Sequence, residues 1–339
     1  MLKKRLELQG MDVIECKYEI QNSILSLITA YIKLMWKHRK LDYDIIIIPR
    51  WRGGLALPLA KILSRKPLIY WVFASPYDIF ISDRKMFKPN SLQAKFISFW
   101  YKWCLKLSDI VIKESFVDID YNLDKFNIDE KKFRRIFLSA DESMFQPCNF
   151  KNSDTGFTVL YFGKFIPLHG VDVTIKAAKL LSHQKEIKFQ LCGDGQTKNE
   201  MEKLVKRYNL RNVEFLGHVD DNILMENINE SDVCLGIFGS SIRAERVATN
   251  KVYQILCSQK PLITMDSEAV RELGLENEKN SLLISRNDPR KLADAILYLK
   301  NSTETRKRIA QAGRELYLER LSMEKTSKEI IHILQTLSG

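Results

Sequence analysis

The sequence predicts an α/β protein with two domains, each built around a parallel β-sheet. Runs rich in Ile, Val and Phe alternate with amphipathic helical patterns along the chain, and this alternation is typical of βαβ units. The length of 339 residues accommodates two domains of about 100–200 residues each. We therefore expect two Rossmann-like domains that face one another across a cleft.

The first domain is expected to span residues 1–150 and to begin with a helix over 2–8 that Gly10 ends. Strand patterns lie at 12–16, 44–48, 67–73 and 109–112, and helical patterns at 55–63 and 92–107. A doubly wound domain usually opens with a strand and a glycine-rich turn. Because this chain opens with a helix, the first strand of the domain is expected to be missing.

The second domain is expected to span residues 151–320. The polar, turn-rich stretch 146–155 is the expected linker before it. Its strand patterns, which have helical patterns between them, lie at 158–162, 188–192, 213–216, 233–237 and 261–264. Residues 323–337 are expected to form one amphipathic helix within a C-terminal segment, residues 321–339.

Basic charge is concentrated in the first domain. The net charge is +11, and residues 31–106 hold 15 basic residues, 4 acidic residues and all five tryptophans. Lys and Arg are attracted to anionic lipid headgroups and Trp and Tyr rings settle at the same depth, so this mixture fits a membrane surface. Nucleic acid attracts the same charges, but no segment matches a nucleic-acid-reading motif. A basic, solvated surface over an aromatic core explains the composition equally well.

Neither secretion nor membrane spanning is expected. No stretch reaches about 18 uninterrupted apolar residues, and the opening Met-Leu-Lys-Lys-Arg lacks the apolar segment of a secretory leader. The six cysteines lie far apart, without a Cys-x-x-Cys pair, and are expected to be buried free thiols. These features predict a cytoplasmic protein without a zinc site.

A turn after the strand at 158–162 is the first candidate for anion binding. Residues 161–170 read Tyr-Phe-Gly-Lys-Phe-Ile-Pro-Leu-His-Gly and lead into a helix over 171–181. Such a turn aims backbone N–H groups and a helix N-terminus at one point. With Lys164 and His169 as cationic donors, it suits an anion such as a diphosphate.

Three further strand ends carry glycine, and four such ends at the carboxyl edge of one parallel sheet would form a ligand crevice. They are Leu-Cys-Gly-Asp-Gly at 191–195, Leu-Gly-His-Val at 216–219 and Leu-Gly-Ile-Phe-Gly at 235–239. A later helix, capped by Thr249 or Asn250, would point its positive end into this crevice. Arg243 and Lys251 lie near the start of that helix and add positive charge.

Together with Asn-Lys-Val-Tyr-Gln…Lys-Pro-Leu-Ile-Thr at 250–264, these segments resemble the donor domain of retaining glycosyltransferases of family 4, which have the GT-B fold. The resemblance covers residues 156–320. It implies a hexosyltransferase that moves a sugar from a nucleoside-diphosphate sugar, with retention at the anomeric carbon, to a lipid-linked or glycan acceptor. It implies no further cofactor and no metal, and a role in polysaccharide biosynthesis.

By this resemblance, the base of the donor lies near Val219, the ribose near Gln254, and the diphosphate beside His169 and the helix that begins at Asn250. The donor-binding candidates are Gly163, Gly193, Gly195, His218, Val219, Gly239, Arg243, Asn250, Lys251 and Gln254. The catalytic candidates are Lys164, His169 and Glu245, with Asp78 from the first domain.

The chain departs from the family pattern at the phosphate and ribose contacts. Lys164 stands where most relatives carry Arg, and His169 stands where they carry Lys. The paired glutamates of the family correspond here to Arg246 and Gln254, and Glu245 lies one position away. A neutral histidine adds less charge at about pH 7. A catalytically inactive scaffold of the same fold therefore stays open as an alternative.

The first domain offers candidate acceptor contacts. Arg50 and Arg52 follow a strand of four isoleucines and would grip an acceptor phosphate. Asp78 ends Ser-Pro-Tyr-Asp and is a candidate to orient an acceptor hydroxyl, although this sequence is also a common turn. The sequence thus predicts a cytoplasmic sugar transferase on the inner face of a membrane. The alternatives are the inactive scaffold and a basic nucleic-acid binder.

Overall fold

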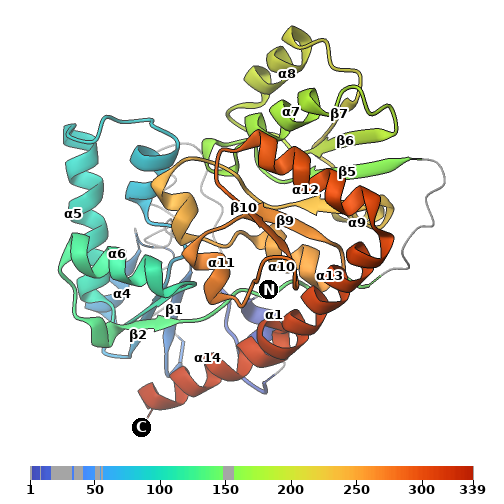
Figure 1. The fold of residues 1–339 in the computed structure, drawn as a ribbon. Helices are drawn as coiled ribbons and strands as arrows, with labels where there is room; N and C mark the ends of the chain where they lie inside the picture. The colour runs from blue at the N-terminus through green and yellow to red at the C-terminus, as the bar shows by residue number, and fades with distance from the viewer. Residues whose placement is uncertain are drawn as a thin grey trace. The chain divides into compact units, whose positions relative to one another are not determined.

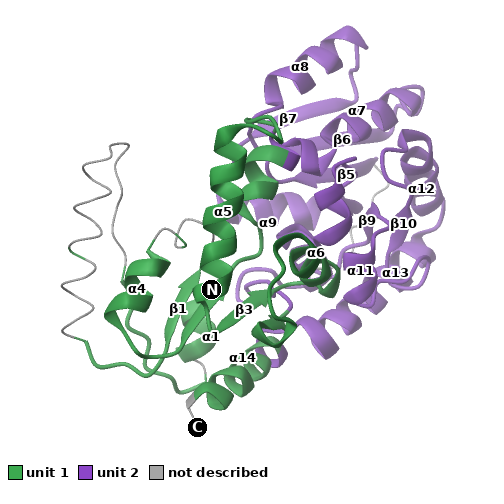
Figure 2. Ribbon diagram, turned by 90° about the vertical axis from the view of Figure 1, so that its left-hand side faces the viewer, with its two compact units in different colours: residues 1–81, 85–136, 326–339 green, residues 82–84, 137–325 purple. Residues whose placement is uncertain are grey.

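The computed structural model describes residues 2–7, 9–16, 33, 41–49, 54, 56–147 and 156–338. The chain divides into two compact units (Figure 2). Unit 1 comprises Met1–Ile81, Lys85–Ile136 and Thr326–Gly339, and unit 2 comprises Ser82–Arg84 and Phe137–Lys325. The division falls after Ile136 rather than near residue 150. Residues 326–339 of the C-terminal segment belong to unit 1, because their apolar side chains pack against the sheet of that unit, whereas residues 321–325 belong to unit 2.

Unit 1 contains a sheet of four parallel strands in sequence order (Figure 1). The strands are β1 (Ile46–Pro49), β2 (Leu68–Trp71), β3 (Ile110–Lys113) and β4 (Phe133–Arg135). Successive side chains of a strand point to opposite faces. In β2, Leu68 and Tyr70 therefore join one apolar cluster, whereas Ile69 and Trp71 join another.

Helices cover both faces of this sheet. The first face packs against helices that follow the strands along the chain, namely α4 (Leu57–Leu63), α5 (Leu92–Leu107) and α6 (Phe116–Phe126). The second face packs against α1 (Leu2–Glu7) and α14 (Met323–Ser338), which come from the two ends of the chain. Unit 1 is thus closed by segments that lie more than 300 positions apart in sequence.

Unit 2 contains six parallel strands in the order β10-β9-β8-β5-β6-β7. Their bounds are β5 (Phe157–Phe162), β6 (Ile187–Cys192), β7 (Val213–Gly217), β8 (Val233–Leu235), β9 (Leu262–Met265) and β10 (Leu282–Ile284). The strand order reverses between β5 and β8. In open parallel sheets, ligands bind at the carboxyl edge at such a reversal.

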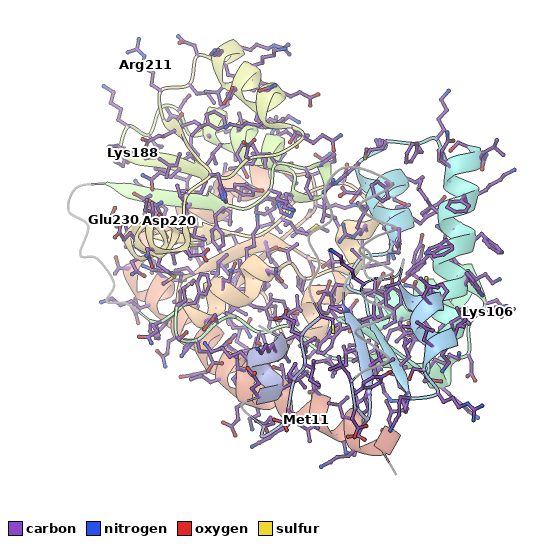
Figure 3. The ribbon with its side chains drawn as sticks, turned by 180° about the vertical axis from the view of Figure 1, so that it is seen from behind. Met11, Lys106, Lys188, Arg211, Asp220 and Glu230 are labelled. Carbon is purple, nitrogen blue, oxygen red and sulfur yellow. The ribbon has the colours of Figure 1, made fainter. Side chains whose placement is uncertain are left out.

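The helices of unit 2 lie on both faces of its sheet. One face packs against α7 (Val171–Leu180), α8 (Lys198–Arg207) and α12 (Pro289–Asn301). The other packs against α9 (Asp221–Glu230) and α10 (Asn250–Cys257). Figure 3 labels Asp220, which caps the N-terminus of α9, and Glu230, its last residue. The remaining helical elements are α11 (Glu268–Glu272), α13 (Thr303–Leu316), η1 (Asp78–Asp83), η2 (Glu130–Lys132), η3 (Pro167–His169), η4 (Ile242–Arg246) and η5 (Tyr317–Leu321).

The structure confirms nearly all strands that the sequence predicts, with ends shifted by a few residues. The strand predicted at 12–16 is wrong, since these residues have no regular secondary structure. Met11 and Val13 are instead partly buried against the second apolar cluster of unit 1, which explains their alternation without a strand partner. Strands β4 and β10 were not predicted, and both have only three residues. Residues 148–155 of the expected linker lie outside the described residues.

The cysteines are free thiols, as expected, in the described part of the chain. Cys104, Cys192, Cys234 and Cys257 are buried, but Cys16 is exposed, so the expectation of burial is wrong at that position. Cys148 lies outside the described residues. Among the helices that the structure describes, none combines the length and apolar character needed to cross a bilayer.

Strand β3 carries a buried charge. Lys113 is fully buried, and its Nζ lies 2.9 Å from Oδ2 of Asp118 and 5.7 Å from the centre of the Tyr101 ring. Asp118 lies in the first turn of α6, where a negative charge also suits the helix dipole. Removing one partner of a buried ion pair leaves the other charge without compensation.

Lys113→Met is therefore expected to lower the free energy of unfolding by about 3–5 kcal/mol, because the Asp118 carboxylate stays buried and loses the Lys113 ammonium. Lys61→Met is the matched control. It removes the partly exposed pair with Asp109, whose atoms lie 2.6 Å apart, and should cost about 0–1 kcal/mol. Urea unfolding followed by tryptophan fluorescence measures both, and equal losses would contradict the prediction.

Candidate functional site

The ends of β5, β6 and β7 meet through backbone contacts between glycines. Gly163 turns the chain after β5 with a φ of +128°, and its N–H donates to the Cys192 carbonyl at 2.9 Å. A Cβ at Gly193 would overlap the Gly163 carbonyl. The Gly193 N–H in turn donates to the Gly217 carbonyl at 2.6 Å. Only glycine permits this close approach of three strand ends.

The end of β8 joins the same cluster. The Phe238 N–H donates to the His169 carbonyl at 3.0 Å. A Cβ at Gly170 would lie 2.6 Å from the Gly239 nitrogen, and a Cβ at Gly239 would overlap the Leu168 carbonyl. The four strand ends that the sequence singles out are thus brought together at the carboxyl edge of the sheet, at the reversal of strand order.

Lys251 extends from the first turn of α10 into this cluster. Its ammonium lies 3.8 Å from the centre of the Tyr161 ring and donates to the Gly236 carbonyl at 3.3 Å. A Cβ at Gly163 would lie 3.2 Å from the Lys251 Nζ. Lys251 is buried and forms no salt bridge with any residue that the structure describes. Burial lowers the pKa of this ammonium well below its ordinary value.

Helix α10 begins at Asn250, and Thr249 is its N-cap residue by backbone conformation. This agrees with the cap that the sequence predicts. The Thr249 side chain does not cap the helix, however, and its buried hydroxyl has no hydrogen-bond partner. The first N–H groups of a helix carry partial positive charge. This N-terminus therefore presents donors that no side chain has satisfied.

His169 is held by a short hydrogen-bonded chain. The Tyr161 hydroxyl donates to the Lys164 carbonyl at 2.8 Å and lies 2.8 Å from the Nδ1 of His169. A hydroxyl has one hydrogen to donate. When that hydrogen is used on the Lys164 carbonyl, the neutral imidazole is assigned the tautomer that donates from Nδ1 to Tyr161 and keeps Nε2 as an acceptor.

Burial and then the nearby Lys251 charge lower the pKa of the His169 imidazole well below its ordinary value. A backbone hydrogen bond with Lys164 acts in the opposite direction, and the charges of Arg243 and Lys164 lower the pKa further. His169 is therefore a neutral side chain when no anion is present. It becomes a cationic donor only by taking up a proton at Nε2.

A family model described as "Glycosyl transferases group 1" matches residues 146–316. This match covers just over half of the chain and includes all four glycine-bearing strand ends and α10. The chain belongs to this family.

This chain is only distantly similar in sequence to the curated proteins that it matches. It is 30% identical over 179 residues to an uncharacterized glycosyltransferase of Methanocaldococcus jannaschii, an alignment that covers 53% of the chain and 48% of the relative. It is 23% identical over 190 residues to the poly(ribitol-phosphate) alpha-N-acetylglucosaminyltransferase of Staphylococcus aureus, covering 55% of the chain and 37% of the relative. The chain spans about half the length of the curated relatives it matches, or less.

Solved structures share the fold. HepE of Anabaena in complex with UDP-glucose superposes with a TM-score of 0.76 at 17% identity, covering 98% of this chain and 88% of that one. Sucrose-phosphate synthase of Thermosynechococcus elongatus gives a TM-score of 0.75 at 18% identity, covering 95% and 80%. The predicted α/β fold with two parallel-sheet domains of the glycosyltransferase GT-B class is confirmed.

The other donor-site candidates of unit 2 lie at loops of the same sheet. Lys164 is exposed, as is His218 after β7, and Val219 is partly buried. Arg243 lies in η4, where its Nη1 is 3.7 Å from Oδ2 of Asp83.

Two further candidates have other surroundings. Glu245 forms a salt bridge of 2.9 Å with Arg286. Gln254 lies half-buried in the second turn of α10, and Arg246, in the place of a family glutamate, is buried.

The candidate acceptor contacts of unit 1 are a buried aspartate, Asp78, and two arginines. Asp78 is buried and accepts a hydrogen bond of 2.8 Å from the Ser75 hydroxyl, which itself accepts from the Asp78 N–H at 2.9 Å. Ser75 and Asp78 thus form the turn that was the alternative interpretation of this sequence. Arg50 and Arg52 lie outside the described residues. Within the described residues, no cluster of three or more His, Cys, Asp or Glu could hold a metal ion.

Sequence reasoning did not identify Tyr161 as part of the site. It belongs to a buried strand, and its sequence surroundings predict an aromatic residue of the core. The sequence feature that could have indicated its contact with His169 is a tyrosine near the end of a strand, followed eight positions later by a histidine in the next turn.

Gly193→Ala is expected to destabilise unit 2 by about 1–3 kcal/mol through overpacking, in addition to its backbone strain, because the new methyl group would overlap the Gly163 carbonyl. Gly217→Ala is the control. It has a φ of +71° but no atom within 4 Å of the new Cβ, so it carries only the left-handed backbone cost of about 1–2 kcal/mol. Thermal unfolding should rank Gly193→Ala below Gly217→Ala; the reverse order would show that the strand ends pack less closely.

Proposed function

We propose that this chain is a retaining hexosyltransferase that moves a sugar from a nucleoside-diphosphate sugar to a lipid-linked or glycan acceptor. One observation carries the proposal most directly. The buried Lys251 ammonium, which has no counter-charge among the described residues, and the N-terminus of α10, which its N-cap side chain does not cap, meet at the carboxyl edge of a sheet that the family model matches. Two relatives with named substrates are sugar transferases, and HepE was solved with UDP-glucose.

The diphosphate of the donor is the group that this edge suits. As the bond between the sugar and the diphosphate breaks, negative charge builds on the departing phosphate. The first N–H groups of α10 supply fixed positive charge, and Lys251 adds its own in the ammonium form, which a bound phosphate favours. The exposed Lys164 adds a third positive group at the Gly163 turn. These protein cations do the work that a metal ion performs in other transferases.

The remaining donor contacts follow from the loop positions. The base is proposed to lie against Val219, beside His218, and the ribose against Gln254, whose amide both donates and accepts hydrogen bonds. Glu245 is engaged with Arg286, which makes it a weaker catalytic candidate than Lys164 and His169.

The acceptor is proposed to be lipid-linked or a glycan, bound through unit 1, with Arg50 and Arg52 contacting its phosphate and Asp78 its hydroxyl. The basic and aromatic composition of this half supports work at an anionic membrane surface on the cytoplasmic side. A role in polysaccharide biosynthesis fits such an acceptor.

A catalytically inactive scaffold is the second candidate function. It is favoured by the buried Arg246, which stands where the family pattern has a glutamate, and by the neutral state of His169. An inactive scaffold would bind the donor without turnover, or would not bind it. Release of free nucleoside diphosphate in the presence of a lipid or glycan acceptor distinguishes the two functions.

Lys251→Met is expected to weaken binding of the donor about tenfold to a hundredfold, because a charge-assisted contact to the diphosphate is lost. Saturation-transfer NMR against UDP-, GDP-, ADP- and dTDP-sugars first identifies the base of the donor, and titration then compares the donor affinities of the variants.

Lys164→Ala should lower turnover more than it lowers stability, since this side chain is exposed.

Lys260→Met is the matched control for Lys251→Met. Lys260 is also buried in unit 2, but its ammonium donates to the carbonyls of Asn229 and Ser231 at 2.9 and 3.0 Å, away from the strand ends. The control should lose stability and keep its donor affinity. Equal donor affinity in Lys251→Met and the wild type would remove Lys251 from the proposed site.

Donor binding is expected to weaken as pH rises between about pH 5 and pH 8. The pKa of His169 is low in the free protein, and a bound anion raises it, so binding is coupled to proton uptake. Affinity is therefore greatest where the imidazole is already protonated and declines as pH rises through the pKa of the complex. A nucleotide sugar is the proper ligand because its diphosphate does not titrate in this range. A His169→Gln variant should lose the part of this dependence that comes from the imidazole, and Lys251→Met reports the part that comes from the buried ammonium, whose pKa is also lowered.

A further inference from the structure

Helix α5 of unit 1 is apolar on two opposite faces. Its inner face holds Ala94, Tyr101, Cys104 and Leu105, all buried against the first face of the sheet. A helix that packs on a sheet needs only one such face, and its other face is ordinarily polar. The outer face of α5 departs from this rule.

Four large apolar side chains lie on the outer face. The exposed fractions are 82% for Leu92, 64% for Phe96, 66% for Phe99 and 38% for Trp103. Their spacing of four, three and four residues places them along one side of the helix. The Trp100 ring packs at 6.3 Å from Phe96 and at 5.4 Å from Trp103, measured between ring centres, and so holds the row together.

Positive charge borders this row. Residues 85–107 contain five lysines and no acidic residue. Lys95, Lys102 and Lys106 lie along α5 itself, and Figure 3 labels Lys106 near its C-terminal end. Helical spacing puts these three on the side adjacent to Phe99 and Leu92. The outer face therefore combines an aromatic stripe with a stripe of ammonium groups.

A pocket of about 410 Å³ opens beside the same stripe. It is lined by Lys95, Phe99 and Lys102 of α5, together with Tyr77 and Lys125. The Lys125 ammonium lies over the Tyr77 ring, 3.2 Å from its centre, and donates to the Tyr121 hydroxyl at 2.6 Å. Three ammonium groups around a small hollow suit a phosphate group.

We propose that the outer face of α5 docks this protein on the surface of an anionic phospholipid bilayer. Phe96, Phe99 and Trp103 enter the boundary between headgroups and acyl chains, and the lysines contact lipid phosphates. A second copy of the chain fits this face less well, because it would bring two stripes of lysines together without an acid between them. This inference deepens the membrane part of the proposed function by naming the surface that performs it.

The test is flotation of the full-length chain with vesicles of phosphatidylcholine alone or mixed with phosphatidylglycerol. We expect binding to the mixed vesicles, weaker binding at high salt, and little binding to phosphatidylcholine alone. The double variant Phe96→Ser/Phe99→Ser should bind at least tenfold more weakly. Lys95→Gln/Lys106→Gln should also weaken binding and should reduce its dependence on salt.

Matched controls come from unit 2. Ile223→Ser removes another exposed apolar side chain, and Lys203→Gln/Lys206→Gln removes two exposed lysines from α8. Both controls should float as the wild type does. Thermal unfolding of every variant checks that the fold is kept, and light scattering gives its oligomeric state.

Equal flotation of the wild type and the α5 variants would overturn the proposal, and so would equal binding to the two kinds of vesicle. A dimer that dissociates in the α5 variants, without vesicle binding, would instead assign the face to self-association. Donor binding is measured in the same samples. A wild type that binds the donor but does not float would reject the docking surface alone, whereas a wild type that floats but does not bind the donor would reject the sugar-transfer proposal and keep the docking surface.

Discussion

Each of the two parallel sheets must be covered on both faces, and this constraint determines where most of the described helices pack. A parallel sheet has two apolar faces, as the alternation of Leu68, Ile69, Tyr70 and Trp71 between two clusters illustrates. Unit 2 covers its faces with helices that follow its own strands. In unit 1, the described helices of that kind pack on one face, and the other face is covered by α1 and α14 from the two ends of the chain. Segments that are distant in sequence thus complete the core of unit 1.

The same close packing explains the chemistry of the candidate site. Glycines let the ends of β5, β6, β7 and β8 approach through backbone alone, which leaves little room for side chains. Lys251 enters the remaining space and is stabilised by the Tyr161 ring and one carbonyl rather than by an acid. A buried cation without a counter-charge is costly in an empty site. An anionic ligand would supply the missing negative charge. Its binding would therefore remove the unfavourable free energy of burying the Lys251 ammonium.

Much of the fold could be predicted because the relevant signals are local. The strands around 158–162 and 188–192 and the glycine turns after them follow from periodicity and residue type alone. The false strand at 12–16 arose because Met11 and Val13 alternate in burial against a cluster built by residues far along the chain. The extent to which the pKa of His169 is lowered could not be predicted either. It depends on the burial of the imidazole and on the nearby Lys251, which lies about 80 positions further along the chain in α10.

The recruitment of α14 also bears on the order in which the protein is made. The ribosome releases the residues of β1–β4 first, yet one face of their sheet lacks the cover of Ile330, Ile333 and Leu334 until these have been synthesised. Unit 2 needs nothing beyond Lys325 and completes its core earlier. The N-terminal unit is therefore the last to mature, and in the meantime a nascent chain exposes an apolar sheet that a chaperone would have to shield.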